Sequence, residues 1–213
     1  MLHALGAHIV SCDELTGIQA LERKAPTKLL RPGLVERREF EYERHGTLSA
    51  IVNFDVATGQ VTEATLGPTR TEQDFTAHMA RTLEKDPEGV WVFVADRLTI
   101  HQSVSLVDLV AEHCGLTEEV AQLRARGGLK AMASRATWLS DPTHGIQFVY
   151  TPTHTSWLNQ IELWFSILVR RALRRGNFPS LEALRERILA FIAYYNQTAK
   201  PFQWTYKGRP LVI

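Results

Sequence analysis

The alternation of apolar and polar positions predicts five strands. Short segments rich in β-branched or aromatic residues and bounded by turn residues are typical of strands. The chain contains five of them: His8–Asp13, Thr47–Val56, Gln60–Leu66, Val90–Ala95 and Ile146–Tyr150. Val90–Ala95 is apolar at nearly every position, which is typical of a strand buried on both faces. The turn Ala57-Thr58-Gly59 joins the second and third segments, and it predicts a hairpin there.

Apolar residues at helical spacing predict four helices between and after these strands. They span Thr71–Glu84, Gln102–His113, Ser156–Arg175 and Leu181–Asn196. The first begins with a Thr-x-x-Asp sequence that resembles a capping box. Residues 23–45 predict an exposed loop that leads into a polar strand, and residues 114–145 are interpreted as an insertion. Strands alternating with helices predict an α/β fold, in one domain that spans residues 1–213.

Composition excludes several classes of protein. The chain has 213 residues, of which 45% are hydrophobic and 22% are charged, so a folded core is expected rather than global disorder. Cys12 and Cys114 lie far apart in no paired motif, which predicts reduced thiols in a cytoplasmic protein. The chain has no run of about 18 apolar residues, so we expect no membrane span.

The small net charge of +1 conceals a strong asymmetry. Residues 1–112 hold 11 Lys and Arg against 17 Asp and Glu, whereas residues 150–213 hold nine against three. A basic segment of this kind either attracts a polyanion or forms a solvated helical face, and the sequence leaves both open.

Three acidic residues occupy comparable places. Asp13 ends the first predicted strand, Asp96 directly follows the buried strand Val90–Ala95, and Glu162 lies early in a predicted helix among large apolar residues. Loops that leave the carboxyl ends of strands converge at one edge of an α/β sheet. Three carboxylates gathered there can hold two Mg²⁺ ions, which prefer oxygen ligands and serve phosphodiester chemistry.

Each acid also has a structural interpretation. Asp13, beside Glu14, can cap the next turn, and Asp96 can cap a following helix. Glu162 can lie at the margin of an apolar helical face with its carboxylate in water. The residue pattern alone does not decide between these roles and a metal site.

Weaker candidates lie near the three acids. His101 follows Asp96 by five residues and is either a site residue or an exposed residue at the start of a helix. Asn159 precedes Glu162 by about one helical turn and either faces the site or caps the helix. Four arginines either complement a helix dipole or hold DNA phosphates: Arg170, Arg171, Arg174 and Arg175. The nearby aromatic residues are expected in the core.

Three segments resemble the catalytic blocks of a bacterial insertion-sequence transposase of the IS-six-thirty branch of the Tc/mariner superfamily. They are Asp13–Arg23, Val94–His101 and Ser156–Phe165. Further segments also resemble this group: Arg37–Tyr42, Arg44–Thr47, Gly67–Glu72 and Lys200–Thr205. The likeness covers nearly the whole chain, and the third block is the most specific.

This resemblance implies an RNase H-like fold with a mixed central sheet flanked by helices. It also implies an Asp-Asp-Glu triad, Asp13, Asp96 and Glu162, that holds two Mg²⁺ ions, with Mn²⁺ as a substitute. It implies hydrolysis at a transposon end, followed by attack of the freed 3′-hydroxyl on target DNA, typically at a TA dinucleotide. The expected partners are double-stranded DNA and a second copy of the chain. The expected location is the bacterial cytoplasm, at the nucleoid.

Two departures from the family pattern matter. The family usually has Asn after the second aspartate, where this chain has Arg97, and a guanidinium turned toward the ions would weaken their binding. The family also carries an N-terminal helix-turn-helix region, whereas only twelve residues precede Asp13, so we expect the catalytic domain alone. A non-catalytic DNA-binding remnant is the alternative, and a structure-selective nuclease is a third. Metal binding distinguishes a transposase from the remnant, and the joining of a 3′-hydroxyl end to a second duplex distinguishes it from the nuclease.

Overall fold

One mixed sheet of five strands organises the chain. The computed structural model describes residues 6–152 and 155–203. Its strands are β1 (His8–Arg23), β2 (Tyr42–Asp55), β3 (Val61–Gly67), β4 (Trp91–Ala95) and β5 (Ile146–Tyr150). They lie in the order β3-β2-β1-β4-β5; β1, β2 and β3 are antiparallel, whereas β4 runs parallel to both β1 and β5. The predicted mixed sheet is therefore confirmed.

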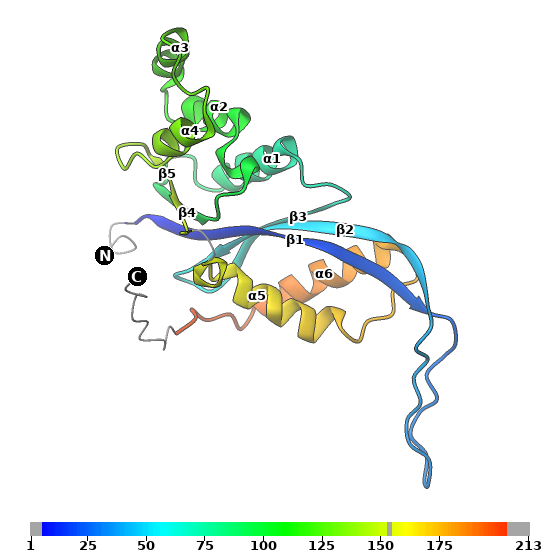
Figure 1. Ribbon diagram of the computed structural model, residues 1–213. Helices are drawn as coiled ribbons and strands as arrows, with labels where there is room; N and C mark the ends of the chain where they lie inside the picture. Colours follow the sequence, from blue (N-terminus) through cyan, green and yellow to red (C-terminus); the bar gives the residue numbers. More distant parts are fainter. Residues whose placement is uncertain (1–5, 153–154, 204–213) are drawn as a thin grey trace, which may run out of the picture.

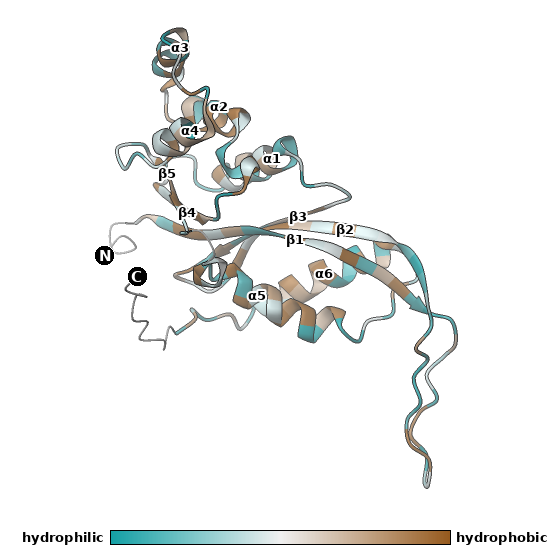
Figure 2. Cartoon of the chain, viewed as in Figure 1, coloured by the Kyte–Doolittle hydropathy of each residue, from teal (hydrophilic) through white to brown (hydrophobic). Residues whose placement is uncertain are grey.

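Helices cover both faces of the sheet (Figure 1). One face carries α1 (Glu72–Leu83), α2 (Val104–His113), α3 (Thr117–Ala125) and α4 (Met132–Leu139); the other carries α5 (Ile161–Leu168) and α6 (Leu181–Asn196). Each face has its own buried apolar cluster, and the sheet separates the two. Figure 2 shows hydrophilic and hydrophobic residues mixed along α5 and α6, as expected of helices with one buried side.

The first strand is much longer than predicted. Strand β1 continues past Asp13 to Arg23, because β2 pairs with it along nearly its whole length. The pairing contains two register irregularities, and one of them includes Gly17 at φ +69°. Asp13 therefore lies within a strand rather than at its end, and the prediction of a strand ending at Asp13 is wrong.

The predicted helix Ser156–Arg175 is also wrong, since it is divided into three pieces. A 3₁₀ turn, η3 (Ser156–Leu158), precedes α5, and a π-helical segment, η4 (Val169–Leu173), follows it. The first break lies at Asn159, whose fully buried side chain bonds to β1 instead of continuing a helix. In contrast, α6 has the predicted bounds, and the capping box at Thr71 is present at the start of α1.

Residues 114–145 contain α3 and α4, and they are not detached from the domain. Val120, Leu129, Trp138 and Leu139 are buried in the cluster that α1 and α2 form against the sheet. Hydrophobic burial thus joins this segment to the core of one face.

Residues 24–41 form an arm that projects from the body between β1 and β2 (Figure 1). Two isolated bridges, Lys28↔Arg37 and Arg31↔Leu34, hold its two sides together. The arm exposes large apolar side chains, including Phe40 at 83%. The expected exposed loop is therefore confirmed.

Within the described part of the chain, no helix has the length and apolar character needed to cross a membrane. Of the motif Lys200–Thr205, residues Trp204 and Thr205 lie outside the described residues.

Candidate active site

The register of two parallel strands brings Asp13 and Asp96 to corresponding positions. The last pair between β1 and β4 is Ser11↔Val94. Asp13 and Asp96 each lie two residues further along the chain, Asp13 inside β1 and Asp96 just after the end of β4. The side chain of Asp96 is 38% exposed, whereas Asp13 is buried. Strand pairing therefore places both residues at the level where β4 ends.

His101 is a buried link between Asp96 and Glu14. It lies in η2 (Thr99–Gln102), just after β4, and is completely buried. Its Nδ1 lies 2.8 Å from Asp96 Oδ1, and its Nε2 lies 2.9 Å from Glu14 Oε1. Burial by itself lowers the pKa of His101, but the hydrogen bonds to the two carboxylates outweigh it and raise this pKa to about 10. The imidazolium thus fixes the orientation of Asp96, so the exposed alternative for His101 is wrong.

Asp96 keeps one oxygen free of these bonds. Its Oδ1 accepts hydrogen bonds from His101 Nδ1 and, at 2.8 Å, from the Leu98 amide. The hydrogen bond from His101 is the largest cause of a lowered pKa for Asp96, and the Leu98 amide and the charge of Arg70 add to it. Asp96 is therefore held ionised, with Oδ2 available to a ligand.

Asn159 ties the start of α5 to β1. Its Nδ2 donates to Cys12 O at 3.0 Å and reaches Asp13 Oδ2 at 3.5 Å, while its Oδ1 accepts from Ser11 Oγ. Ser11 Oγ also accepts from the Ile161 amide at 2.9 Å. These buried bonds set where α5 begins, directly beside Asp13.

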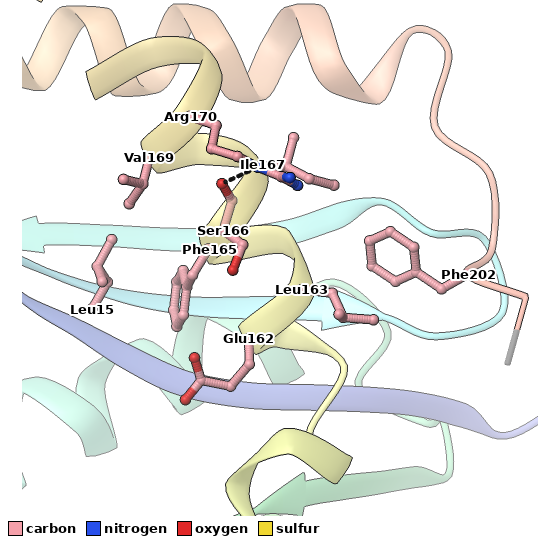
Figure 3. A pocket seen from close by; sticks show the side chains of 9 residues that line it. All are labelled: Leu15, Glu162, Leu163, Phe165, Ser166, Ile167, Val169, Arg170 and Phe202. Carbon is pink, nitrogen blue, oxygen red and sulfur yellow. Dashed lines mark hydrogen bonds between the residues drawn. The ribbon is translucent and has the colours of Figure 1, made fainter. Parts of the chain in front are cut away.

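Glu162 lies in the first turn of α5, at the edge of a hollow of about 710 Å³ (Figure 3). Apolar side chains form most of its lining: Leu15, Leu163, Phe165, Ile167, Val169 and Phe202. Burial, followed by the charge of Asp96, raises the pKa of Glu162. Figure 3 shows its carboxylate pointing across the edge of β1, away from Phe202 and Arg170.

The three acids act on one another electrostatically. The charge of Asp96 raises the pKa of both Asp13 and Glu162. For Asp13, burial is the largest cause, the Glu14 amide opposes it, and the charges of Glu14 and Asp96 add to it, which brings its pKa to about 7. Both raised values mean that the ionised forms lack a sufficient nearby positive charge. A divalent cation supplies that charge, so this donor set fits a metal site.

The carboxylates do not form a closed ligand cluster. Across residues 6–152 and 155–203, one group of three potential ligands has ligand atoms that all lie within 4.8 Å of one another. This group is Glu22, Glu43 and His45, and it does not include the three acids. Glu22 and Glu43 are cross-strand neighbours near the base of the arm, and His45 Nε2 lies 2.8 Å from Glu22 Oε2.

Arg97 packs against Tyr150. Its guanidinium carbon lies 5.8 Å from the centre of the Tyr150 ring on β5. The arginine beside the acids is instead Arg70, whose Nη1 lies 3.6 Å from Glu14 Oε2 and whose charge lowers the pKa of Asp96. Arg70 and Glu14 belong to segments that resemble the transposase family, but nothing in the sequence marked either as a site residue.

The four candidate arginines do not form one surface. Arg170 lines the hollow beside Glu162, whereas Arg171 and Arg175 line a separate hollow with Arg187. Arg174 is exposed, and its amide makes a π-type hydrogen bond to Val169 O at 2.8 Å. Among the aromatic residues, Trp164, Phe165 and Phe191 are buried in the core, as expected, whereas Tyr194 is exposed.

Comparisons with known proteins agree with this architecture. The model of the DDE superfamily endonuclease family matches residues 8–185. A search of the curated proteins finds no match.

Among solved structures, the chain is similar to the Mos1 mariner paired-end complex with Mn, at a TM-score of 0.55 and 16% identity over 91% of this chain and 49% of that one. It is similar to a pre-cleavage Mos1 transpososome, at a TM-score of 0.55 and 15% identity, over 87% of this chain and 48% of that one. It is also similar to the Mos1 strand transfer complex, at a TM-score of 0.53 and 13% identity, over 89% of this chain and 48% of that one. The chain thus spans about half the length of these Mos1 chains. This likeness shows the fold, which is the expected RNase H-like one.

Proposed function

The chain belongs to the DDE superfamily endonuclease family, and from that premise we propose that it is the catalytic domain of a DNA transposase. The proposed reaction is hydrolysis of a phosphodiester at a transposon end, followed by transfer of the freed 3′-hydroxyl to target DNA. The observation that carries the proposal is the β1–β4 register. It sets Asp13 and Asp96 two residues beyond the same strand pair, and Glu162 is electrostatically coupled to Asp96.

Asp13, Asp96 and Glu162 are the residues proposed to hold two divalent cations, Mg²⁺ or Mn²⁺. Bound at such a site, the cations activate the attacking oxygen and stabilise the leaving one. Oxygen-only ligands suit Mg²⁺, and the similar Mos1 complex was solved with Mn. The raised pKa values of Asp13 and Glu162 support the proposal, because cation binding favours the ionised carboxylates.

Other residues hold these carboxylates in place. His101, anchored on Glu14, fixes the rotamer of Asp96 through Oδ1. Asn159 contacts Asp13 and fixes the start of α5, and thereby the backbone position of Glu162. The Arg97 guanidinium has the Tyr150 ring as a partner, which supports an active site over a remnant.

Double-stranded DNA is the proposed substrate, both as the transposon end and as the target. The similar Mos1 structures are a paired-end complex and a strand transfer complex, which supports these two DNA roles and two copies of the chain on DNA. The excess of nine basic over three acidic residues after position 149 supplies positive charge for phosphates. The IS-six-thirty grouping, the bacterial nucleoid location and the assignment of residues 1–213 to one domain stay predictions.

The test is nicking and end joining with a labelled duplex taken from the ends of the element that carries this gene. With Mg²⁺ or Mn²⁺, the parent protein should release a 3′-hydroxyl and join it to a second duplex. Glu162→Gln should abolish both reactions, because one ligand charge is lost. Glu186→Gln makes the same change at an exposed position of α6 and should retain them.

Other outcomes point to the alternatives. DNA binding with no metal-dependent nicking in the parent would support the non-catalytic remnant. Nicking without joining of the 3′-hydroxyl would support a nuclease on the same fold. Equal activity in the parent and in Glu162→Gln would remove Glu162 from the site.

A further inference from the structure

A second hollow of about 360 Å³ lies between η4, the turn at residues 176–178 and the start of α6. Three arginines line it: Arg171, Arg175 and Arg187. The rest of the lining is Ala172, Gly176, Asn177, Phe178 and Ala183, so it includes no carboxylate. We refer to this hollow as the arginine pocket.

The three guanidinium groups lack an ion-pair partner among the residues that the structure describes. Within the described ranges, none of the three forms an ion pair, whereas Arg185 on the same helix pairs with Glu182 at 3.5 Å and donates to Leu66 O at 2.6 Å. Three like charges around one concavity repel one another. An anion in the pocket relieves this repulsion, and guanidinium forks match the geometry of phosphate oxygens.

The wall of the pocket is held in place by the sheet. The Phe178 amide donates to Leu21 O of β1 at 2.8 Å, and the Phe178 ring packs against Gly176 so closely that a Cβ there would meet it at 2.1 Å. Asn177 Oδ1 accepts from the Arg23 amide at 2.7 Å, which leaves the Asn177 NH₂ group as a donor. The backbone of the pocket is therefore fixed by the turn, so the ordering that anion binding requires is confined to the exposed arginine side chains.

We propose that the arginine pocket binds one backbone phosphate of the DNA substrate, distinct from the scissile phosphate. This inference rests on the proposed function. Arg171 follows Glu162 by nine positions, which is at most about 14 Å at the α-helical rise of about 1.5 Å per residue, since the last three positions lie in the π-helical η4. A phosphate engaged beside Glu162 cannot reach the pocket at that distance. The pocket thus sets the register of the duplex, and Arg187 is a DNA-binding residue that the sequence did not indicate.

The test uses the full chain and a 30-base-pair duplex, without divalent cations, and measures binding by fluorescence anisotropy over a series of salt concentrations. Arg187→Gln should weaken binding and reduce the slope of log K against log salt by about 0.9, the share of one phosphate contact. Arg187→Lys should keep the slope and lose affinity, because it keeps the charge without the fork. Arg126→Gln, the same charge change at an exposed position beside α3, should match the parent.

The possible results separate this proposal from the proposed function. An unchanged slope in Arg187→Gln overturns the pocket, even if the parent nicks and joins DNA. A reduced slope supports it, even if the parent proves catalytically inactive. An equal loss in Arg126→Gln overturns it by showing a general charge effect. Thermal stabilisation of the parent, but not of Arg187→Gln, by inorganic phosphate, with no change in DNA binding, would assign the pocket to free phosphate and overturn the DNA role.

Discussion

Arg97 illustrates how one side chain's direction changes a functional expectation. In the sequence Arg97 directly follows Asp96, so its positive charge is expected to repel bound cations. In the structure its guanidinium carbon lies 5.8 Å from the centre of the Tyr150 ring. Its charge therefore acts on an aromatic face, where such contacts contribute about 0.5–1 kcal/mol.

We predict that Arg97→Asn leaves the divalent-ion dependence of nicking unchanged and lowers the free energy of unfolding by about 0.5–1 kcal/mol. Titration of nicking with Mg²⁺ and urea denaturation check the two parts. Tyr150→Leu removes the other side of the contact together with the hydrogen bond from the Tyr150 hydroxyl to His101 O at 2.7 Å, so it should cost more stability than Arg97→Asn. A rise in activity at low Mg²⁺ would show that Arg97 does reach the cations.

His78 on α1 is a buried residue far from the acidic site. It is fully buried, and its Nδ1 lies 2.7 Å from Thr65 Oγ1. Burial, followed by the charges of Arg81 and Lys85, lowers its pKa from 6.5 to about 3. The folded protein therefore keeps this imidazole neutral where the unfolded chain protonates it.

The linked prediction concerns stability against pH. Above the unfolded pKa of 6.5, His78 is neutral in both states; as the pH falls below 6.5 the unfolded state alone gains a proton, so stability is lost. When the pH falls from 7.5 to 5.5, the protonation of His78 in the unfolded state should lower the free energy of unfolding by about 1.4 kcal/mol. Urea denaturation at both pH values should show His78→Gln losing about that much less than the parent. Ser134→Ala changes no titratable group, so it is the control and should lose as much as the parent.

At the scale of elements, the start of α5 depends on Ser11. Its hydroxyl bonds to both Asn159 and the Ile161 amide inside the core. We predict that Ser11→Ala lowers the free energy of unfolding by about 2–4 kcal/mol, because two buried polar groups lose their partner. Ser134→Ala removes an exposed hydroxyl and should cost under about 0.5 kcal/mol. Equal losses in the two variants, by urea denaturation, would contradict the anchoring role.

The arm at residues 24–41 contributes little to either core, since its apolar side chains are exposed. Lys24 N donates to Glu41 O at 3.2 Å, so the two sides are already paired at the base. We predict that replacing residues 25–40 with Asn-Gly, which favours tight hairpin turns, changes the free energy of unfolding by under about 0.5 kcal/mol. A loss above about 2 kcal/mol in urea denaturation would show that the arm packs on the body.

At the scale of the whole molecule, two apolar clusters share one sheet. Val10, Ile51 and Phe93 belong to the cluster under α2, while Ala50, Val52 and Phe54 belong to the cluster under α6. Alternating residues of β2 thus enter opposite cores. Because the two clusters share the same strands, unfolding of the strands under one cluster would also expose the apolar residues of the other.

We predict that the two faces unfold together. In hydrogen exchange followed by mass spectrometry under increasing urea, amides of α2 and α6 should converge on one opening free energy. Amides of the arm should exchange at once and provide the internal control. A lower opening free energy for one helix that never merges with the other would show that each face unfolds separately.

Local patterns explain what was predictable. The bounds of β5 and α6 agree with their predictions, because short-range periodicity and turn residues specify such elements. The α/β class followed from the same pattern, and the mixed sheet with flanking helices followed from the family resemblance. The sequence, through its family resemblance, also pointed to Asp13, Asp96 and Glu162, whose assignment as metal ligands stays a prediction.

The remainder depended on contacts between residues far apart in sequence. The full length of β1 required its pairing with β2, and the break before α5 required Asn159 to bond to β1. Side-chain directions, such as those of His101 toward Glu14 and Arg97 toward Tyr150, arise only once the strands are packed together. The sequence by itself therefore determined most of the elements and marked the acidic candidates, because both are local properties of the chain. Only the tertiary structure decided what surrounds those acids, because burial and long-range hydrogen bonds select the rotamers.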